Sequence, residues 1–304
     1  MKRATSGLYP PLAGNKTKPL STIEAFAYAA KLRPQAAASW LDQLRAVTPE
    51  YISSLVGLIP PTHATDVTSR EWIPVGRLTR SNHTYKFAYT RGALRAPNFQ
   101  PFGRLSDIYA TYESDTLFPV FANRVISRSR PEYADYQRWI GLDNITSDPL
   151  AILAMTGGVR GTDSIELFPE PKRTVEGQYR VTFFARGLRH LPKTSLEAIS
   201  HLEPHTRLKL LRDCQNGSDQ FAICLATMPP SYLVGYCPKY YAQDISNFLR
   251  EDVGAVDVQV KCVNKDAPLD MRLLCTVSAP WKEGYVPFVD HSDFDLLHRE
   301  TSPA

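Results

Sequence analysis

The chain has 304 residues, of which 43% are hydrophobic and 11% aromatic. This is the composition of a folded protein, long enough for two domains or for one domain with large additions, and it excludes a disordered chain. The net charge of +4 equals the four basic side chains of residues 1–20, which contain no acid. Beyond residue 20, charge alone gives no general argument for nucleic-acid binding.

No apolar run approaches the ~18–20 residues that cross a bilayer, and the N-terminus lacks the apolar core of a secretory signal. We therefore expect a cytoplasmic protein. The five cysteines lie between Cys214 and Cys275 without a C-x-x-C spacing, which argues against a disulfide framework and a zinc finger. No nucleophile motif or P-loop is present, and Pro204 separates His201 from His205. We expect no catalytic residues, no cofactor and no metal site.

In chain order, residues 1–20 are expected to form a flexible basic arm and residues 21–71 a small helical unit. A capping box at Ser21–Glu24 opens its first helix, and its third helix is predicted from Thr48 to Ile59, before two prolines. This unit is either a stand-alone bundle or a docking surface for a partner.

The pattern changes to short strands at Trp72. Strands are predicted at 73–78 and 84–90, helices at 131–141 and 147–156, and a pair of strands at 164–168 and 179–185. Residues 70–104 hold seven basic side chains and one acid, Glu71. Such a segment either faces an anion or forms an evenly solvated surface.

Part of this region resembles the N-terminal subdomain of HipA-type kinases. The resemblance covers residues 72–172 and rests on VGRLTR, YKFAYT, LFPVFANRV, DPLAILAMTGG and SIELFPEP. It departs from the family at 126–128 and at Val159, where the family has an acidic ending and an aspartate. The catalytic kinase region does not follow, so the resemblance implies a small mixed α/β subdomain without kinase activity.

The region after residue 181 resembles a HIRAN domain, a small β-barrel with one or two helices. The motifs occur in the family's order: a Gly-Leu-Arg strand at 187–189, an N-x-x-D turn with an apolar strand at 216–223, Val234-Gly235, a helix, and two closing strands. Residues 181–290 are therefore expected to form the HIRAN-like domain, and residues 291–304 a tail.

The HIRAN resemblance implies recognition of single-stranded DNA, in particular of a free 3′ end. Arg189 and Lys239 would contact phosphate, while Asn216 and Asp219 would shape the turn and bond the sugar hydroxyl. Turn chemistry alone also explains the last two residues. His190 and Ser218 stand where the family places aromatic residues, and Tyr236 is a candidate for the missing stacking surface. The predicted nucleic-acid contacts are Arg189, His190, Asn216, Asp219, Tyr236 and Lys239.

Together these patterns predict an α+β protein with a helical unit, a HipA-like subdomain and a C-terminal HIRAN-like barrel. The expected function is a non-catalytic nucleic-acid-binding adaptor in a bacterial toxin–antitoxin or anti-phage system, with a protein partner such as a HipA-like kinase. The alternative is an antitoxin-like interaction subunit that binds such a kinase or another effector without DNA.

Overall fold

A computed structural model describes the protein at residues 54–59, 72–81, 84–141, 148–160, 163, 165–217, 219–288 and 292–297. For residues 54–59 only the backbone is described. The predicted arm, the first two predicted helices, Ser218 and the end of the tail lie outside the described residues. All described residues belong to one compact unit, 47–304.

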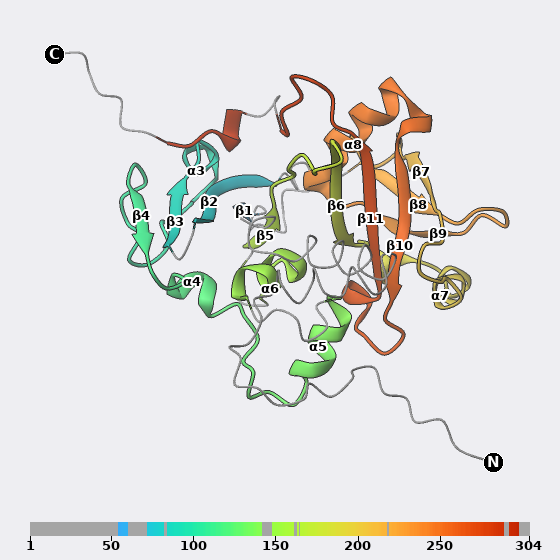
Figure 1. Ribbon diagram of the computed structural model, residues 1–304, viewed down its shortest axis with the longest axis horizontal. Coiled ribbons are helices and arrows are strands. Elements are labelled where there is room, and N and C mark those ends of the chain that lie inside the picture. Colours follow the sequence, from blue (N-terminus) through green and yellow to red (C-terminus); the bar gives the residue numbers. More distant parts are fainter. Residues whose placement is uncertain are drawn as a thin grey trace, which may run out of the picture. The chain divides into compact units, whose positions relative to one another are not determined.

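The first part of this unit is an antiparallel sheet of five strands in the order β4-β3-β2-β1-β5 (Figure 1). The strands are β1 (Ser54–Ile59), β2 (Ile73–Ser81), β3 (Thr84–Tyr89), β4 (Thr111–Ser114) and β5 (Glu166–Pro169). The strands predicted at 73–78 and 84–90 are thereby confirmed.

The third predicted helix is wrong over Ser54–Ile59, where the chain forms β1. A short apolar run fits a buried helix and a buried strand equally well by periodicity. Here the strand is stabilised by pairing on both sides: Val56 lies opposite Arg77 of β2 and opposite Phe168 of β5. The central strand of the first sheet thus comes from the region predicted to be helical.

Four short helices accompany this sheet: α3 (Gly92–Arg95), α4 (Pro119–Ala122), α5 (Tyr133–Trp139) and α6 (Pro149–Thr156). The predictions at 131–141 and 147–156 are confirmed. Asp148 caps α6 by accepting from the Leu150 amide at 3.0 Å, and Gly157 ends it in a left-handed conformation. The core between sheet and helices is rich in aromatic rings, with Phe87, Tyr89 and Phe121 almost fully buried.

The second part contains two three-stranded antiparallel sheets, ordered β10-β11-β6 and β7-β8-β9 (Figure 1). The strands are β6 (Gln178–Phe184), β7 (Lys209–Arg212), β8 (Ile223–Ala226), β9 (Leu233–Tyr236), β10 (Asp257–Val263) and β11 (Leu273–Pro280). Single bridges, Arg186–Tyr236 and Arg207–Gln259, join the sheets at their edges. The predicted barrel is therefore not confirmed as one continuous closed sheet.

The strands predicted at 164–168 and 179–185 exist as β5 and β6, but they do not pair with each other. β5 pairs with β1, and β6 pairs with β11. The prediction of a pair was wrong because it took neighbours in sequence as neighbours in space, whereas each strand completes a different sheet.

Helices α7 (Lys193–Ser200) and α8 (Lys239–Glu251) pack on the second part, and one-turn 3-10 helices connect its strands. These short helices are η1 (Leu188–His190), η2 (Val253–Ala255) and η3 (Leu269–Met271), and η4 (Ser292–Phe294) follows near the C-terminus. Along α8, Tyr241, Ile245, Phe248 and Leu249 recur at helical spacing and are buried. This face anchors α8 in the core and fixes the position of its first residue, Lys239.

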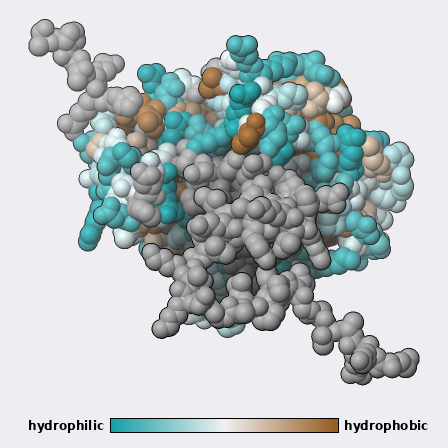
Figure 2. All heavy atoms as spheres, viewed as in Figure 1, coloured by the Kyte–Doolittle hydropathy of each residue, from teal (hydrophilic) through white to brown (hydrophobic). Residues whose placement is uncertain are grey.

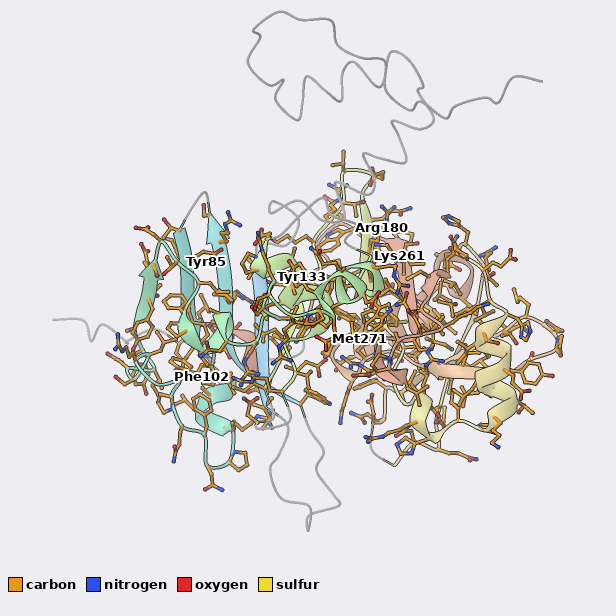
Figure 3. All side chains as sticks on the ribbon, turned by 90° about the horizontal axis from the view of Figure 1, so that it is seen from below. Tyr85, Phe102, Tyr133, Arg180, Lys261 and Met271 are labelled. Carbon is orange, nitrogen blue, oxygen red and sulfur yellow. The ribbon has the colours of Figure 1, made fainter. Side chains whose placement is uncertain are left out.

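The two parts share their cores. Phe168 of β5 belongs to the core of the second part, whereas Phe184 of β6 and Leu274 of β11 belong to the core of the first. The side-chain amide of Asn264 donates to the Trp139 carbonyl at 2.8 Å. In Figure 3, Tyr85 and Phe102 lie at the five-stranded sheet and Lys261 lies at the second part, with Met271 between them. The parts are thus packed together and not joined by a free linker.

Most of the coloured surface in Figure 2 is hydrophilic, with scattered apolar side chains. Within the basic stretch 70–104, Arg77, Arg80, Lys86 and Arg95 pair with carboxylates, which favours the interpretation as a solvated surface over an anion site. Among the described residues, no helix combines the length and the apolar character that crossing a membrane requires.

Candidate nucleic-acid interface

A groove of about 860 Å³ lies at one end of the second part. Its walls come from the segment after β6, the turn between β7 and β8, the end of β9 and the start of α8. All six predicted contact residues line this one groove: Arg189, His190, Asn216, Asp219, Tyr236 and Lys239. The structure therefore brings together side chains that lie up to 50 positions apart in the sequence.

The segment after β6 presents Arg189 and His190 to solvent. Gly187 adopts a left-handed conformation (φ 79°) and opens η1, so the predicted Gly-Leu-Arg strand is a 3-10 turn. Leu188 is buried and anchors the turn, while Arg189 and His190 are exposed. The Arg189 Nε donates to His190 Nε2 at 3.0 Å, a contact that requires this ring nitrogen to be unprotonated. The turn therefore holds a cation at the mouth of the groove.

The β7–β8 turn is held by its own polar side chains. The Asn216 side-chain oxygen accepts from the Asp219 amide at 3.1 Å, and Asp219 Oδ1 accepts from the Phe221 amide at 2.9 Å. Burial raises the pKa of Asp219, against the opposing effects of the Phe221 amide and the charge of Lys239. Both residues thus have a demonstrated structural role, and their contact with a sugar hydroxyl stays a prediction.

Tyr236 ends β9 and closes one side of the groove. Its backbone exchanges hydrogen bonds of 2.8 and 2.9 Å with Arg186. Its hydroxyl donates to Asp213 Oδ2 at 3.1 Å, and burial, with this carboxylate and Cys224, raises its pKa. The side chain is therefore fixed against the segment after β6 and remains neutral at physiological pH.

The floor of the groove contains residues that sequence reasoning missed. Glu166 of β5, only 7% exposed, forms an ion pair with Arg186, and the Tyr240 hydroxyl donates to Glu166 Oε1 at 3.4 Å. Burial raises the pKa of Glu166, while the Arg186 charge and the Tyr240 bond act against this rise. The Tyr240 ring stacks on Phe168 at 4.1 Å between centroids.

Trp72 also lines the groove, although it precedes β2 and lies more than 100 positions before the predicted domain. Its ring meets Tyr240 edge to face, with the centroids 6.2 Å apart. A buried acid in an apolar strand was the one available signal for Glu166. The participation of Trp72 depends on tertiary packing alone and left no local signal.

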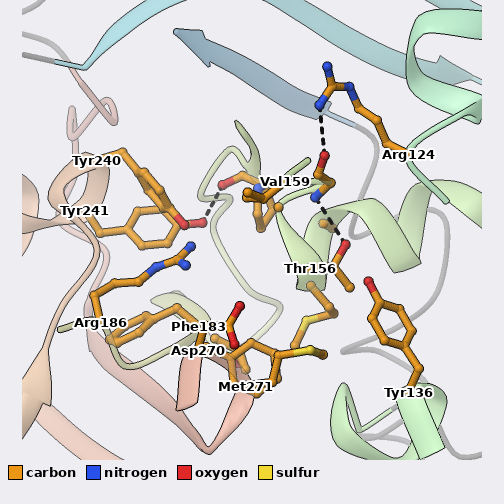
Figure 4. A pocket seen from close by; sticks show the side chains of 17 residues that line it. Arg124, Tyr136, Thr156, Val159, Phe183, Arg186, Tyr240, Tyr241, Asp270 and Met271 are labelled. Atoms are coloured by element: carbon orange, nitrogen blue, oxygen red, sulfur yellow. Dashed lines mark hydrogen bonds between the residues drawn. The ribbon is translucent and has the colours of Figure 1, made fainter. Parts of the chain in front are cut away.

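A second cavity, of about 230 Å³, lies beside the groove and shares Arg186, Tyr240 and Asp270 with it (Figure 4). Arg124 contributes a guanidinium that is only 2% exposed. It donates to the Gly158 carbonyl at 2.9 Å and pairs with Asp163 at 2.7 Å. Its bonding to the backbone indicates a structural role in holding the end of α6 against β5.

Two of the carboxylates that line the groove already have partners. Glu166 pairs with Arg186, and Asp219 accepts backbone bonds. Within the part of the chain that the structure describes, no cluster of three or more His, Cys, Asp or Glu side chains is placed to hold a metal ion. The arrangement suits binding: two cations at the rim, aromatic rings along the walls and a closed polar floor.

These features define residues 178–282 as a small antiparallel β domain with two α-helices, α7 and α8, and a ligand-sized groove. The same residues match the family model of the HIRAN domain, so the chain contains a HIRAN domain, as its motifs predicted. The match does not extend to residues 72–172, and the resemblance of that region to HipA-type kinases stays a prediction.

Two solved structures are similar to the chain. A crystal structure of a protein from Lactobacillus plantarum is 18% identical, covers 34% of this chain and 99% of that one, and gives a TM-score of 0.27. The crystal structure of the HIRAN domain of human HLTF is 18% identical, covers 35% of this chain and 84% of that one, and gives a TM-score of 0.26. No curated protein matches the chain.

Proposed function

We propose that the groove binds single-stranded nucleic acid and prefers a free 3′ end of DNA. The observation that carries this proposal is the convergence of the six predicted contact residues on one groove of a HIRAN domain. The exposed Arg189 and the partly exposed Lys239 are suited to phosphate oxygens, and the aromatic walls are suited to bases. Residues 181–290 contain 12 basic and 12 acidic side chains, so attraction to DNA has to arise locally in the groove.

Fluorescence anisotropy with the full chain tests this function. The ligands are short single strands that carry either a 3′ hydroxyl or a 3′ phosphate, titrated at several salt concentrations. We expect tighter binding of the 3′ hydroxyl strand. Equal, strongly salt-dependent binding of both strands would reduce the interaction to non-specific charge contact, and no binding would refute the proposal.

The double variant Arg189→Ala/Lys239→Ala tests the rim of the groove. Each phosphate contact on a single strand contributes about −0.7 to the slope of the logarithm of the association constant against the logarithm of the salt concentration. The variant is therefore expected to make this slope about 1.4 less steep. Affinity should fall about tenfold or more near physiological salt. The variant Arg250→Ala/Lys265→Ala removes the same charge from exposed positions of the same domain outside the groove, and it should bind as the wild type does.

We further propose that the protein acts by binding and not by catalysis. The paired state of Glu166 and Asp219 supports this, because an acid or base needs a group that is available to substrate. Incubation of the purified chain with an end-labelled strand, Mg²⁺ and nucleoside triphosphates should leave the strand unchanged. Cleavage or modification that disappears in Asp219→Asn would contradict this proposal.

We propose that the protein is an adaptor in a bacterial toxin–antitoxin or anti-phage system. It would bind nucleic acid in its groove and a protein partner on another surface. The support for a protein partner is the resemblance of residues 72–172 to the N-terminal subdomain of HipA-type kinases. The rival is an antitoxin-like subunit that binds a HipA-like kinase without DNA. DNA binding distinguishes them: both predict that Arg189→Ala/Lys239→Ala still captures the partner in a pull-down, but the rival predicts no DNA binding by the wild type.

A further inference from the structure

The HIRAN domain of this chain lacks large aromatic residues at two positions where its motif resemblance leads one to expect them. His190 and Ser218 stand there. The rings that the domain does bring to the groove are held in protein contacts: the Tyr240 ring stacks on Phe168 at 4.1 Å, and the Tyr236 hydroxyl bonds Asp213. The exposed His190 imidazole is smaller than an indole, so a large stacking surface for a base is best supplied from outside the domain.

Trp72 has the required properties. It lines the groove, it is partly exposed, and its indole is the largest ring there. It lies outside residues 178–282 and reaches the groove because Ile73, its neighbour, is 4% exposed and pairs with Ile59 of β1. The edge-to-face contact with Tyr240 further limits its rotation. A ring already fixed in place loses little conformational entropy when a base stacks on it.

We propose that Trp72 is the base-stacking residue of the groove, so that the nucleic-acid site is built by both parts of the chain. The ligand is a nucleobase of a single strand whose phosphates contact Arg189 and Lys239. This inference rests on the proposed function and adds a residue that no motif of the domain supplies. Stacking of this kind tolerates every base, so Trp72 contributes affinity without sequence preference.

The test compares two strands: an oligothymidine, and the same strand with abasic sites in its last three nucleotides. Stacking of one base contributes about 1–3 kcal/mol, which corresponds to about 5- to 150-fold in affinity. Trp72→Ala is expected to weaken the binding of the oligothymidine by this factor and to leave the binding of the abasic strand unchanged. Trp72→Phe should retain most of the affinity because it keeps a flat ring.

Intrinsic fluorescence adds a second readout, because the chain has four tryptophans. Binding of oligothymidine should quench part of the emission of the wild type and of Trp281→Phe, whose substitution lies outside the groove. That quenching should be lost in Trp72→Phe.

The outcomes separate the two proposals. If the wild type binds neither strand, the proposed function falls, and this inference with it. If the wild type binds oligothymidine and Trp72→Ala binds it equally well, only the inference is overturned. If Trp72→Ala weakened the binding of both strands equally, the inference would also be overturned. A residue with a purely structural role affects the binding of a strand with bases and of a strand without them alike.

Discussion

Glu166 is the residue whose burial has the clearest consequence for the pH dependence of the free energy of unfolding. Its pKa in the folded protein lies above the ordinary 4.5 because burial disfavours the charge, and Arg186 limits the rise. A raised pKa means that the group's contribution is fully present below pH 4.5 and is lost as pH rises through the folded pKa. Removal of Arg186 should shift that loss to higher pH and enlarge it.

Arg186→Leu tests this balance. We expect a loss of about 1–3 kcal/mol near neutral pH, below the ~3–5 kcal/mol of fully buried pairs, because the Arg186 side chain is 36% exposed. The deficit against the wild type should shrink toward pH 4.5. Urea unfolding between pH 4 and 8 measures it. In the background Glu166→Gln the deficit should no longer depend on pH, and a deficit that stays constant in the single variant would contradict the assignment.

A second residue-level prediction concerns Tyr89, which is completely buried. Its hydroxyl donates to the Leu105 carbonyl and accepts from the Phe102 amide, both at 2.7 Å, and burial raises its pKa to about 12. Tyr89→Phe leaves both backbone groups unsatisfied and should lower the free energy of unfolding by about 1–3 kcal/mol in urea titrations. Tyr109→Phe, at an exposed position, should change it by less than about 0.5 kcal/mol.

At the scale of elements, Asp148 connects α6 to the first sheet. One carboxylate oxygen caps the helix and the other pairs with Arg80 at 2.7 Å. Asp148→Ala loses both contacts and should cost about 2 kcal/mol, whereas Asp148→Ser keeps a cap and should recover about half of that loss. Thermal unfolding measures the difference. The exposed Asp115→Ala serves as the control, and equal losses in the Ala and Ser variants would show that the cap contributes nothing.

Elements with strong local signals were predictable from the sequence. The Asp148-Pro149 start and the Gly157 end define α6 through capping chemistry. The motifs of the HIRAN domain indicated strands of the domain and also six residues that line its groove. Residues 54–59 were not predictable, because an apolar run becomes a strand only when two partners pair with it. The same reason hid Trp72 and Glu166, whose place in the groove depends on contacts between distant segments.

At the scale of the whole molecule, each part buries side chains in the core of the other: Phe168 in the second core, and Phe184 and Leu274 in the first. This shared packing predicts cooperative unfolding. Trp281, which follows β11 and packs on the second core, reports on the second part, and a tryptophan introduced at Phe99, which packs on the first core, reports on the first. In single-tryptophan versions of the chain, both probes should give the same urea midpoint, because neither core is complete alone. Midpoints that differ by more than experimental error would contradict the shared packing.

The shared cores also bear on how the protein is made. The ribosome releases β1 to β5 well before β11, yet the first core needs Leu274 from β11 as well as Phe184 from β6. A nascent chain halted near residue 180 therefore exposes apolar surface that its own later segments have yet to cover. The first core cannot be completed before residue 274 emerges, and a chaperone that shields exposed apolar segments has its longest opportunity to bind in that interval.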